Sequence, residues 1–253
     1  MPDFSTPAIM LRSIDHGDYD LIIKFLTLKQ GKVTVIAKYA KKSKKRFSGI
    51  LELFSVLELV YKTGRGKGLY LLKEASLKEP FMKIRGDIKK TAYASYWTEI
   101  INQWLEEGTR QESIYYLFRH VLQALDSGRI PEEALSILFQ IRFMKISGFS
   151  PNLSLCSTCG IEIDSMEGNS ILFDLAKGGI VCKGCASYPS GRLYLSRGTI
   201  KQLEWVGSGD IKKAELIRFT SPAIKESLVF LEAFVPYHLG REPRSLSFLR
   251  KIR

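Results

Sequence analysis

The residues whose spacing most clearly predicts chemistry are the four cysteines of the chain. Cys156 and Cys159 form one C-x-x-C pair, Cys182 and Cys185 form a second, and 22 residues separate the two pairs. A two-residue spacer lets both thiolates of a pair approach one metal ion from a tight turn. Two such pairs complete a tetrahedral shell of four sulfurs, so no coordination position remains for water. The pattern predicts one structural Zn²⁺ rather than a redox or disulfide pair.

A second pattern is a cluster of cations in the first third of the chain. Six of the nine residues from position 38 to 46 are basic, namely Lys38, Lys41, Lys42, Lys44, Lys45 and Arg46. Clustered Lys and Arg side chains neutralise phosphates and release counterions, which favours binding to a nucleic-acid backbone. Tyr39 and Phe47 lie among these cations and could stack on exposed bases. A solvated basic loop is the alternative.

Further cations lie on or beside the neighbouring predicted strands and turns. We expect the nucleic-acid face to include Arg12, Lys24, Lys32, Arg65 and Lys67. The last two belong to a glycine-rich turn at residues 64–68, which lacks the G-x-x-x-x-G-K-[ST] spacing and the following helix of a phosphate-binding loop. As a hairpin turn it would place both cations at a barrel rim, where a DNA contact and a plain turn are equally open.

The overall charge agrees with a polyanionic partner. The net charge is +12, and residues 1–79 hold fifteen Lys and Arg against eight Asp and Glu. DNA, RNA and an anionic membrane are candidate partners, and simple solubility is the alternative. The sequence contains no run of about 18 apolar residues and no secretory signal at its start. We therefore predict a cytoplasmic protein. With DNA as its polyanion it would be nucleoid-associated and have no membrane partner.

Residues 1–79 have the pattern of a small β-barrel. Five segments enriched in Val, Ile, Leu and aromatic residues are separated by turn residues, and we expect strands near 8–12, 20–28, 32–38, 54–61 and 69–75. A five-stranded OB barrel fits this count and leaves no exposed edge strands. An SH3-like barrel fits the count nearly as well, so the count leaves both open.

Helical periodicity begins after Asp87. We expect helices near 88–104, 114–125, 131–148, 199–206 and 221–234, the last capped by Ser221. Between them, residues 170–174 and 180–181 can pair as a short ribbon beside the second cysteine pair. The predicted fold class is thus α+β, with an OB barrel at 1–79, an all-α domain at 80–150 and 186–253, and an inserted zinc module at 151–185.

No pattern of catalytic residues accompanies these elements. The three histidines, His16, His120 and His238, are isolated from any nucleophile motif. We therefore predict a protein that is not an enzyme. Two other classes stay open: a zinc-ribbon RNA-binding or transcription-associated factor, and an enzyme with a structural zinc site, such as a sirtuin deacetylase or an adenylate kinase. Such an enzyme needs a glycine-rich nucleotide loop near its start, which this sequence lacks.

Several segments, taken in order, resemble the bacterial RecO family of recombination mediators. They are residues 9–20, 31–33, 38–47, 92–96, 148–160 and 238–249, which together extend over nearly the whole chain. The chain departs from the family pattern at Tyr39, where Gly is common, and at Asp18, where Glu is common. Because some relatives lack the cysteines, zinc is not expected to perform the mediator function itself.

The resemblance implies a function in DNA repair and homologous recombination without enzymatic activity. It implies binding to single-stranded and double-stranded DNA, and annealing of complementary strands. It also implies help in loading RecA onto DNA coated by single-strand binding protein, with RecR as a partner. Such a mediator must engage the acidic, apolar C-terminal tail of single-strand binding protein. The basic residues Arg241, Arg244, Arg250 and Arg253 make a tail site in the helical domain plausible.

Overall fold

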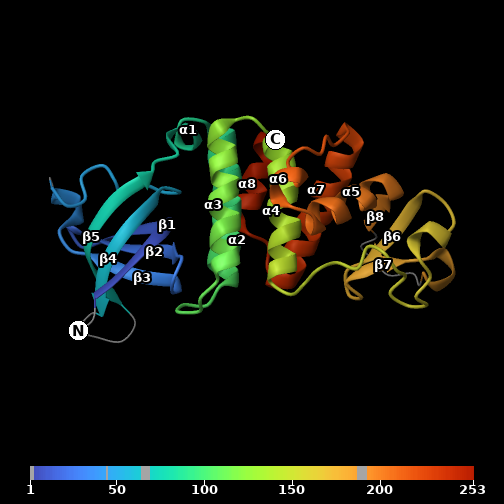
Figure 1. Cartoon of the computed structure of the whole chain (residues 1–253), viewed down its shortest axis with the longest axis horizontal. Coiled ribbons are helices and arrows are strands. Elements are labelled where there is room, and N and C mark those ends of the chain that lie inside the picture. Colours follow the sequence, from blue (N-terminus) through green and yellow to red (C-terminus); the bar gives the residue numbers. More distant parts are fainter. Residues whose placement is uncertain (1–2, 44, 64–68, 187–192) are drawn as a thin grey trace. The chain divides into compact units, whose positions relative to one another are not determined.

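The computed structural model describes residues 3–43, 45–63, 69–186 and 193–253 (Figure 1). The chain forms two compact units, one of Met1–Ser127 with Lys251–Arg253 and one of Gly128–Arg250. The first unit contains a β-barrel and the three α-helices that follow it, and the second contains the cysteines. These three helices therefore belong to the same compact unit as the barrel.

Five strands of the first unit form a closed barrel in the order β1-β2-β3-β5-β4. Neighbouring strands pair antiparallel except β3 and β5, which pair parallel. This Greek-key order is that of an OB fold, and it decides between the two barrels that the strand count left open. The strands are β1 Asp3–His16, β2 Asp20–Thr27, β3 Gly31–Ala37, β4 Val56–Thr63 and β5 Tyr70–Glu79.

Alternating side chains of these strands fill the barrel. Ile23 and Phe25 on β2 and Val33 and Val35 on β3 all belong to the buried core. Tyr61 on β4 is also buried, and its hydroxyl donates to Gln30 Oε1 at 2.6 Å, so its polar atom has a partner. Because successive strand residues point to opposite faces, the even-numbered residues of β2 and β3 point away from the core. Part of that outer face is covered, because Leu26, Lys32 and Thr34 are buried. The part that remains partly exposed, and thus open to a ligand, carries Asp20, Ile22, Lys24 and Ile36.

Three helices complete the first unit: α1 Met82–Arg85, α2 Ile88–Trp104 and α3 Glu112–Ser127. Asp87 caps α2, because its carboxylate accepts hydrogen bonds from the amides of Lys89 and Lys90. Helices α2 and α3 contact each other. Their connecting loop contacts the barrel, since the amide of Gly108 donates to the carbonyl of Lys32 at 2.9 Å.

The second unit packs helices around a small sheet. Helix α4 contacts α5 and α7, and both α5 and α7 contact β8. The sheet has the strand order β7-β6-β8. The elements are α4 Glu132–Ile146, β6 Ser170–Asp174, β7 Gly179–Val181, β8 Leu193–Ser196, α5 Arg197–Ser208, α6 Ile211–Ala214, α7 Ser221–Leu239 and α8 Arg244–Ile252, whose last residues belong to the first unit. The described part of the chain also contains the short 3₁₀ turns η1 Ala40–Lys42, η2 Ile163–Ser165 and η3 Lys183–Cys185.

Each predicted strand and helix has a counterpart in the structure, and the predicted ribbon is the β6–β7 pair. The predicted cap of α7 is wrong by one residue, because the hydroxyl of Thr220, not of Ser221, accepts from the amide of Ala223. The sequence pattern did not predict α1, α6, α8 or β8. Among the described residues, no helix is both long enough and apolar enough to cross a membrane.

Candidate metal centre and nucleic-acid interface

The four predicted metal ligands come together in the second unit. The sulfur atoms of Cys156, Cys159, Cys182 and Cys185 all lie within 4.8 Å of one another. None of the four forms a disulfide. The Sγ atoms of Cys159 and Cys182, one from each pair, are 3.7 Å apart. The two C-x-x-C segments therefore form a single cluster.

Two tight turns and a close backbone contact position these sulfurs. The amide of Gly160 donates to the carbonyl of Cys156 at 2.9 Å, which closes the first turn, and the amide of Cys185 donates to the carbonyl of Cys182 at 3.1 Å, which closes the second. The first turn is fixed to β7 by a bond from the Ser157 amide to the Ile180 carbonyl. Gly179 permits this approach, because a Cβ atom there would lie 2.3 Å from Ser157 Oγ.

The cluster fits a tetrahedral metal ion. A Zn–S distance of about 2.3 Å places two sulfurs of a tetrahedron about 3.8 Å apart. The distance of 3.7 Å between Cys159 and Cys182 agrees with this value and is far from the roughly 2 Å of a disulfide. Four sulfur donors in this geometry suit zinc or an iron–sulfur centre. The residues thus form a site that can hold a metal ion, with no further ligand position.

Electrostatics at the cluster also favour a cation. Burial acts to raise the pKa of Cys156, but hydrogen bonds from the backbone amides of Cys159 and Cys182 outweigh it and lower the pKa to about 6. Hydrogen bonds with the sulfurs of Cys182 and Cys159 raise the pKa of Cys185 to about 12. Protons are therefore shared unequally among closely spaced sulfurs, and a bound cation would replace the retained protons.

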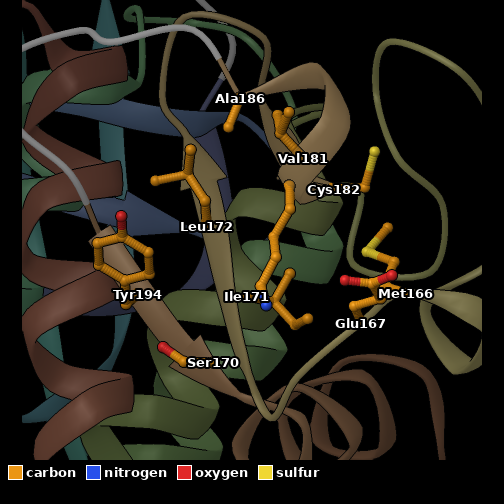
Figure 2. Close-up of a pocket in the computed structure, with 10 residues that line it drawn as sticks. Met166, Glu167, Ser170, Ile171, Leu172, Val181, Cys182, Ala186 and Tyr194 are labelled. Carbon is orange, nitrogen blue, oxygen red and sulfur yellow. The ribbon is translucent and has the colours of Figure 1, made fainter.

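A pocket of about 170 Å³ lies beside the cluster (Figure 2). Leu172 and Tyr194, which lie directly opposite each other on β6 and β8, line one side, and Cys182 lines another. Pockets for small molecules are commonly 300–1,000 Å³ in volume. This pocket is smaller, and its lining contains no nucleophile paired with a base. It gives no support to an enzymatic function.

The outer face of the barrel carries its side chains in rows across the strands. In one row Arg12 on β1 pairs directly with Lys24 on β2. The next row along the strands is apolar and consists of Ile14, Ile22 and Ile36. Neither Arg12 nor Lys24 makes an ion pair with a described residue, and like charges directly opposite each other are unfavourable. A bound phosphate would relieve this repulsion.

The cations that follow β3 lie at the β1–β2 turn. Lys38 Nζ is 2.5 Å from Asp20 Oδ2, and Lys41 Nζ is 2.9 Å from Asp15 Oδ2, so both cations have carboxylate partners within the chain. Side-chain and backbone hydrogen bonds from Lys38 and Tyr39 lower the pKa of Asp20. The remaining described cations of this segment, Lys42, Lys45 and Arg46, are exposed.

Two sequence expectations for this face require correction. Lys32 is only 7% exposed, and its ammonium donates to the carbonyl of Asn102 at 2.8 Å. Burial lowers its pKa, and Lys32 is therefore a contact between the barrel and α2 rather than a residue of the outer surface. Phe47 is 3% exposed and belongs to the barrel core, so it cannot stack on a base. Three predicted cations, Lys44, Arg65 and Lys67, lie outside the described residues.

Part of this surface was not predicted from the sequence. The unpredicted residues are Tyr19, whose ring stacks on that of Tyr39, and the isoleucine row. The signal for the row was present, because Ile22 and Ile36 occupy the outward positions of strands whose inward positions are also apolar. A β-strand with apolar residues on both faces is covered by another element or offers an apolar surface to a ligand.

Models of known protein families match both the barrel and the helical part of the chain. Residues 1–81 match the family model described as Recombination protein O N terminal, and residues 85–247 match Recombination protein O C terminal. The chain belongs to the RecO family. A DNA repair protein RecO of Desulfosudis oleivorans is 46% identical over 258 residues, covering 100% of this chain and 99% of that protein. The protein of the same name from Desulfatibacillum aliphaticivorans is 44% identical, covering 100% and 98%.

Membership of the RecO family gives the surface and the cluster their context. The family acts as a mediator in DNA repair and recombination and is not known for catalysis, in agreement with the lack of a catalytic motif in the sequence. Family membership implies that the polyanion is DNA. It gives no support to a zinc-ribbon transcription factor or a zinc-containing enzyme.

Proposed function

We propose that this protein is a non-enzymatic recombination mediator that binds single-stranded and double-stranded DNA through the outer face of its barrel. The observation that carries the proposal is the direct pairing of Arg12 with Lys24, two cations that have no carboxylate partner among the described residues. Lys42, Lys45 and Arg46 extend the cationic surface at one end of the strands. Lys38 and Lys41 contribute less, because each already contacts a carboxylate.

Annealing follows from such a surface without bond-making chemistry. Phosphate contacts neutralise the backbone of each strand, so two strands held on cationic surfaces repel each other less. Family membership supports a further part of the proposal, that the protein acts with RecR to help load RecA onto DNA coated by single-strand binding protein. Contact with the tail of single-strand binding protein belongs to the same proposal. Arg250 is a weaker candidate for that contact, because it pairs with Glu232 and Glu242.

We further propose that the cysteine cluster holds one Zn²⁺ with a structural role. Zinc would join the turn of Cys156 and Cys159 to that of Cys182 and Cys185 and would stabilise the β6–β7 ribbon between them. With four sulfur ligands it has no open position for substrate or water. Zinc content of the purified protein tests this role directly.

The proposed function is tested by annealing complementary strands coated with single-strand binding protein. The purified chain is added, with and without RecR, and duplex formation is followed over time. We expect faster annealing, and no dependence on ATP. A chain that binds neither strand form and leaves the annealing rate unchanged would refute the proposal.

A further inference from the structure

Tyr39 has a left-handed backbone conformation that packing in the core does not explain. Its φ of 56° and ψ of 26° place it in the left-handed region, where a non-glycine residue is strained. Two other non-glycine residues among those described have positive φ, Phe54 and Phe81. Both of these are buried, at 2% and 6% exposure, so core packing offsets their strain. Tyr39 is 62% exposed and gains no such burial.

A set of contacts nevertheless holds the Tyr39 ring in one place. Its amide donates to Asp20 Oδ1 at 2.8 Å, and its carbonyl accepts from the Lys42 amide at 3.2 Å. Its ring stacks on Tyr19 with 5.9 Å between ring centres and 15° between planes. Lys42 Nζ lies 4.0 Å from the centre of the Tyr19 ring. Tyr19, Tyr39 and Lys42 together form what we call the tyrosine platform.

The tyrosine platform combines the two features by which proteins bind unpaired bases. Exposed aromatic rings stack on bases, and adjacent cations contact the phosphates of the same strand. Asp20 links the platform to the outer face, because it holds the Tyr39 amide and also pairs with Lys38. In a duplex the bases are already stacked on each other, so the platform can contact only the backbone. A ring that adds affinity through stacking therefore favours single strands.

We infer that Tyr39, supported by Tyr19, stacks on an unpaired base and gives this protein a preference for single-stranded over double-stranded DNA. The inference rests on the proposed DNA-binding function. The strained backbone keeps the ring exposed before DNA arrives, so less ordering is needed on binding. The lysines bind both forms of DNA through phosphate, whereas Tyr39 distinguishes them.

The test replaces Tyr39 with residues that suit its backbone. Glycine and asparagine both tolerate the left-handed conformation, so Tyr39→Gly and Tyr39→Asn remove the ring without adding strain. Tyr39→Phe keeps the ring and is the matched control. Dissociation constants are measured on an oligonucleotide and on its duplex at several salt concentrations. A fluorescent base analogue in the oligonucleotide, quenched by stacking, reports the contact directly.

We expect both ring-less variants to bind single strands at least about fivefold more weakly, the lower limit for loss of one stacked base. Duplex affinity and the slope of log K against log salt should stay unchanged, quenching should disappear, and Tyr39→Phe should behave as the parent. If the parent binds DNA, two results would overturn the inference but not the proposed function. One is an equal loss of affinity for both DNA forms in the ring-less variants, and the other is no loss of affinity in them. A parent that binds neither form would overturn the proposed function as well.

Discussion

The pairing of Arg12 with Lys24 allows DNA affinity and stability to be changed in opposite directions. We consider Arg12→Gln combined with Lys24→Gln, since glutamine removes the charge but keeps a polar side chain with two methylenes on the strand surface. Both side chains lie on the outer face, directly opposite each other on β1 and β2. Like charges opposite each other on a sheet cost roughly 0.2–1 kcal/mol, so the free energy of unfolding should stay unchanged or rise by that amount.

The expected loss of affinity follows from counterion release. Each lost phosphate contact lowers the slope of log K against log salt by about 0.7 on single strands and 0.9 on duplex, so two contacts lower it by about 1.4 to 1.8. If the part of the affinity that does not depend on salt is unchanged, binding at 0.1 M salt weakens roughly 25- to 60-fold. Thermal unfolding and binding across a salt series give both quantities from one preparation.

A matched control separates position from net charge. Lys212→Gln with Lys213→Gln removes the same two charges from α6, in the second unit. We expect this control to change the slope little. Equal slope changes in the two double variants would show that only net charge matters. An unchanged slope in the Arg12 and Lys24 variant would remove the outer face from the DNA-binding surface.

Three further predictions concern stability. Gly31→Ala should lower the free energy of unfolding by more than about 3 kcal/mol, because its Cβ would lie 1.8 Å from the Thr109 carbonyl oxygen; Gly49→Ala, also at positive φ but with open space, should cost only about 1–2 kcal/mol. Cys156→Ser should abolish metal binding and lower the melting temperature, measured by metal analysis and calorimetry. A parent protein that is as stable without metal as with it would contradict this prediction. Burial raises the pKa of Tyr61 to about 12, so the folded protein keeps the phenol proton up to a higher pH than the unfolded chain does. The free energy of unfolding should therefore be unaffected by Tyr61 below pH 10 and fall by about 1.4 kcal/mol per pH unit between pH 10 and 12. Denaturant titrations at alkaline pH measure this fall.

The sequence predicted those elements whose pattern is local. Residues such as Val33 and Val35 alternate with outward residues, which predicts a strand, and paired C-x-x-C segments predict one metal cluster. The elements it missed give a weak local signal. Helices α1 and α6 have four residues each, barely one helical turn, so periodicity cannot define them. Helix α8 has buried Leu246 and Leu249 three residues apart, a signal that was present but was not used.

The errors at the proposed DNA-binding face come from contacts between residues that are distant in sequence. Lys32 occupies an outward position of β3, as Lys24 does on β2, and the pattern alone cannot distinguish them. The difference is that residues 102–108, about 70 positions later, cover Lys32 and bind its ammonium and carbonyl groups. Likewise, the pairing of Lys38 with Asp20 depends on how two turns meet. Local sequence therefore predicts which residues are cations but not which of them are available.

The number of cations that are free to contact phosphate sets the salt dependence of DNA binding expected for the whole protein. Eleven cations were predicted to contact DNA, which corresponds to a slope of about −8 to −10. The structure removes Lys32 by burial and offers Lys38 and Lys41 only in competition with Asp20 and Asp15. Five described cations remain, Arg12, Lys24, Lys42, Lys45 and Arg46, which corresponds to a slope of about −3.5 to −4.5.

The three predicted cations outside the described residues extend that range to at most about −7. The slope for the parent protein on single-stranded and duplex DNA, measured in a monovalent salt series, decides between these counts. A slope steeper than about −8 would mean that the lysine–carboxylate pairs open on binding, so that Asp15 and Asp20 do not limit the number of phosphate contacts. A slope within the expected range would assign these two carboxylates a role in holding Lys38 and Lys41 near the tyrosine platform rather than in contact with phosphate.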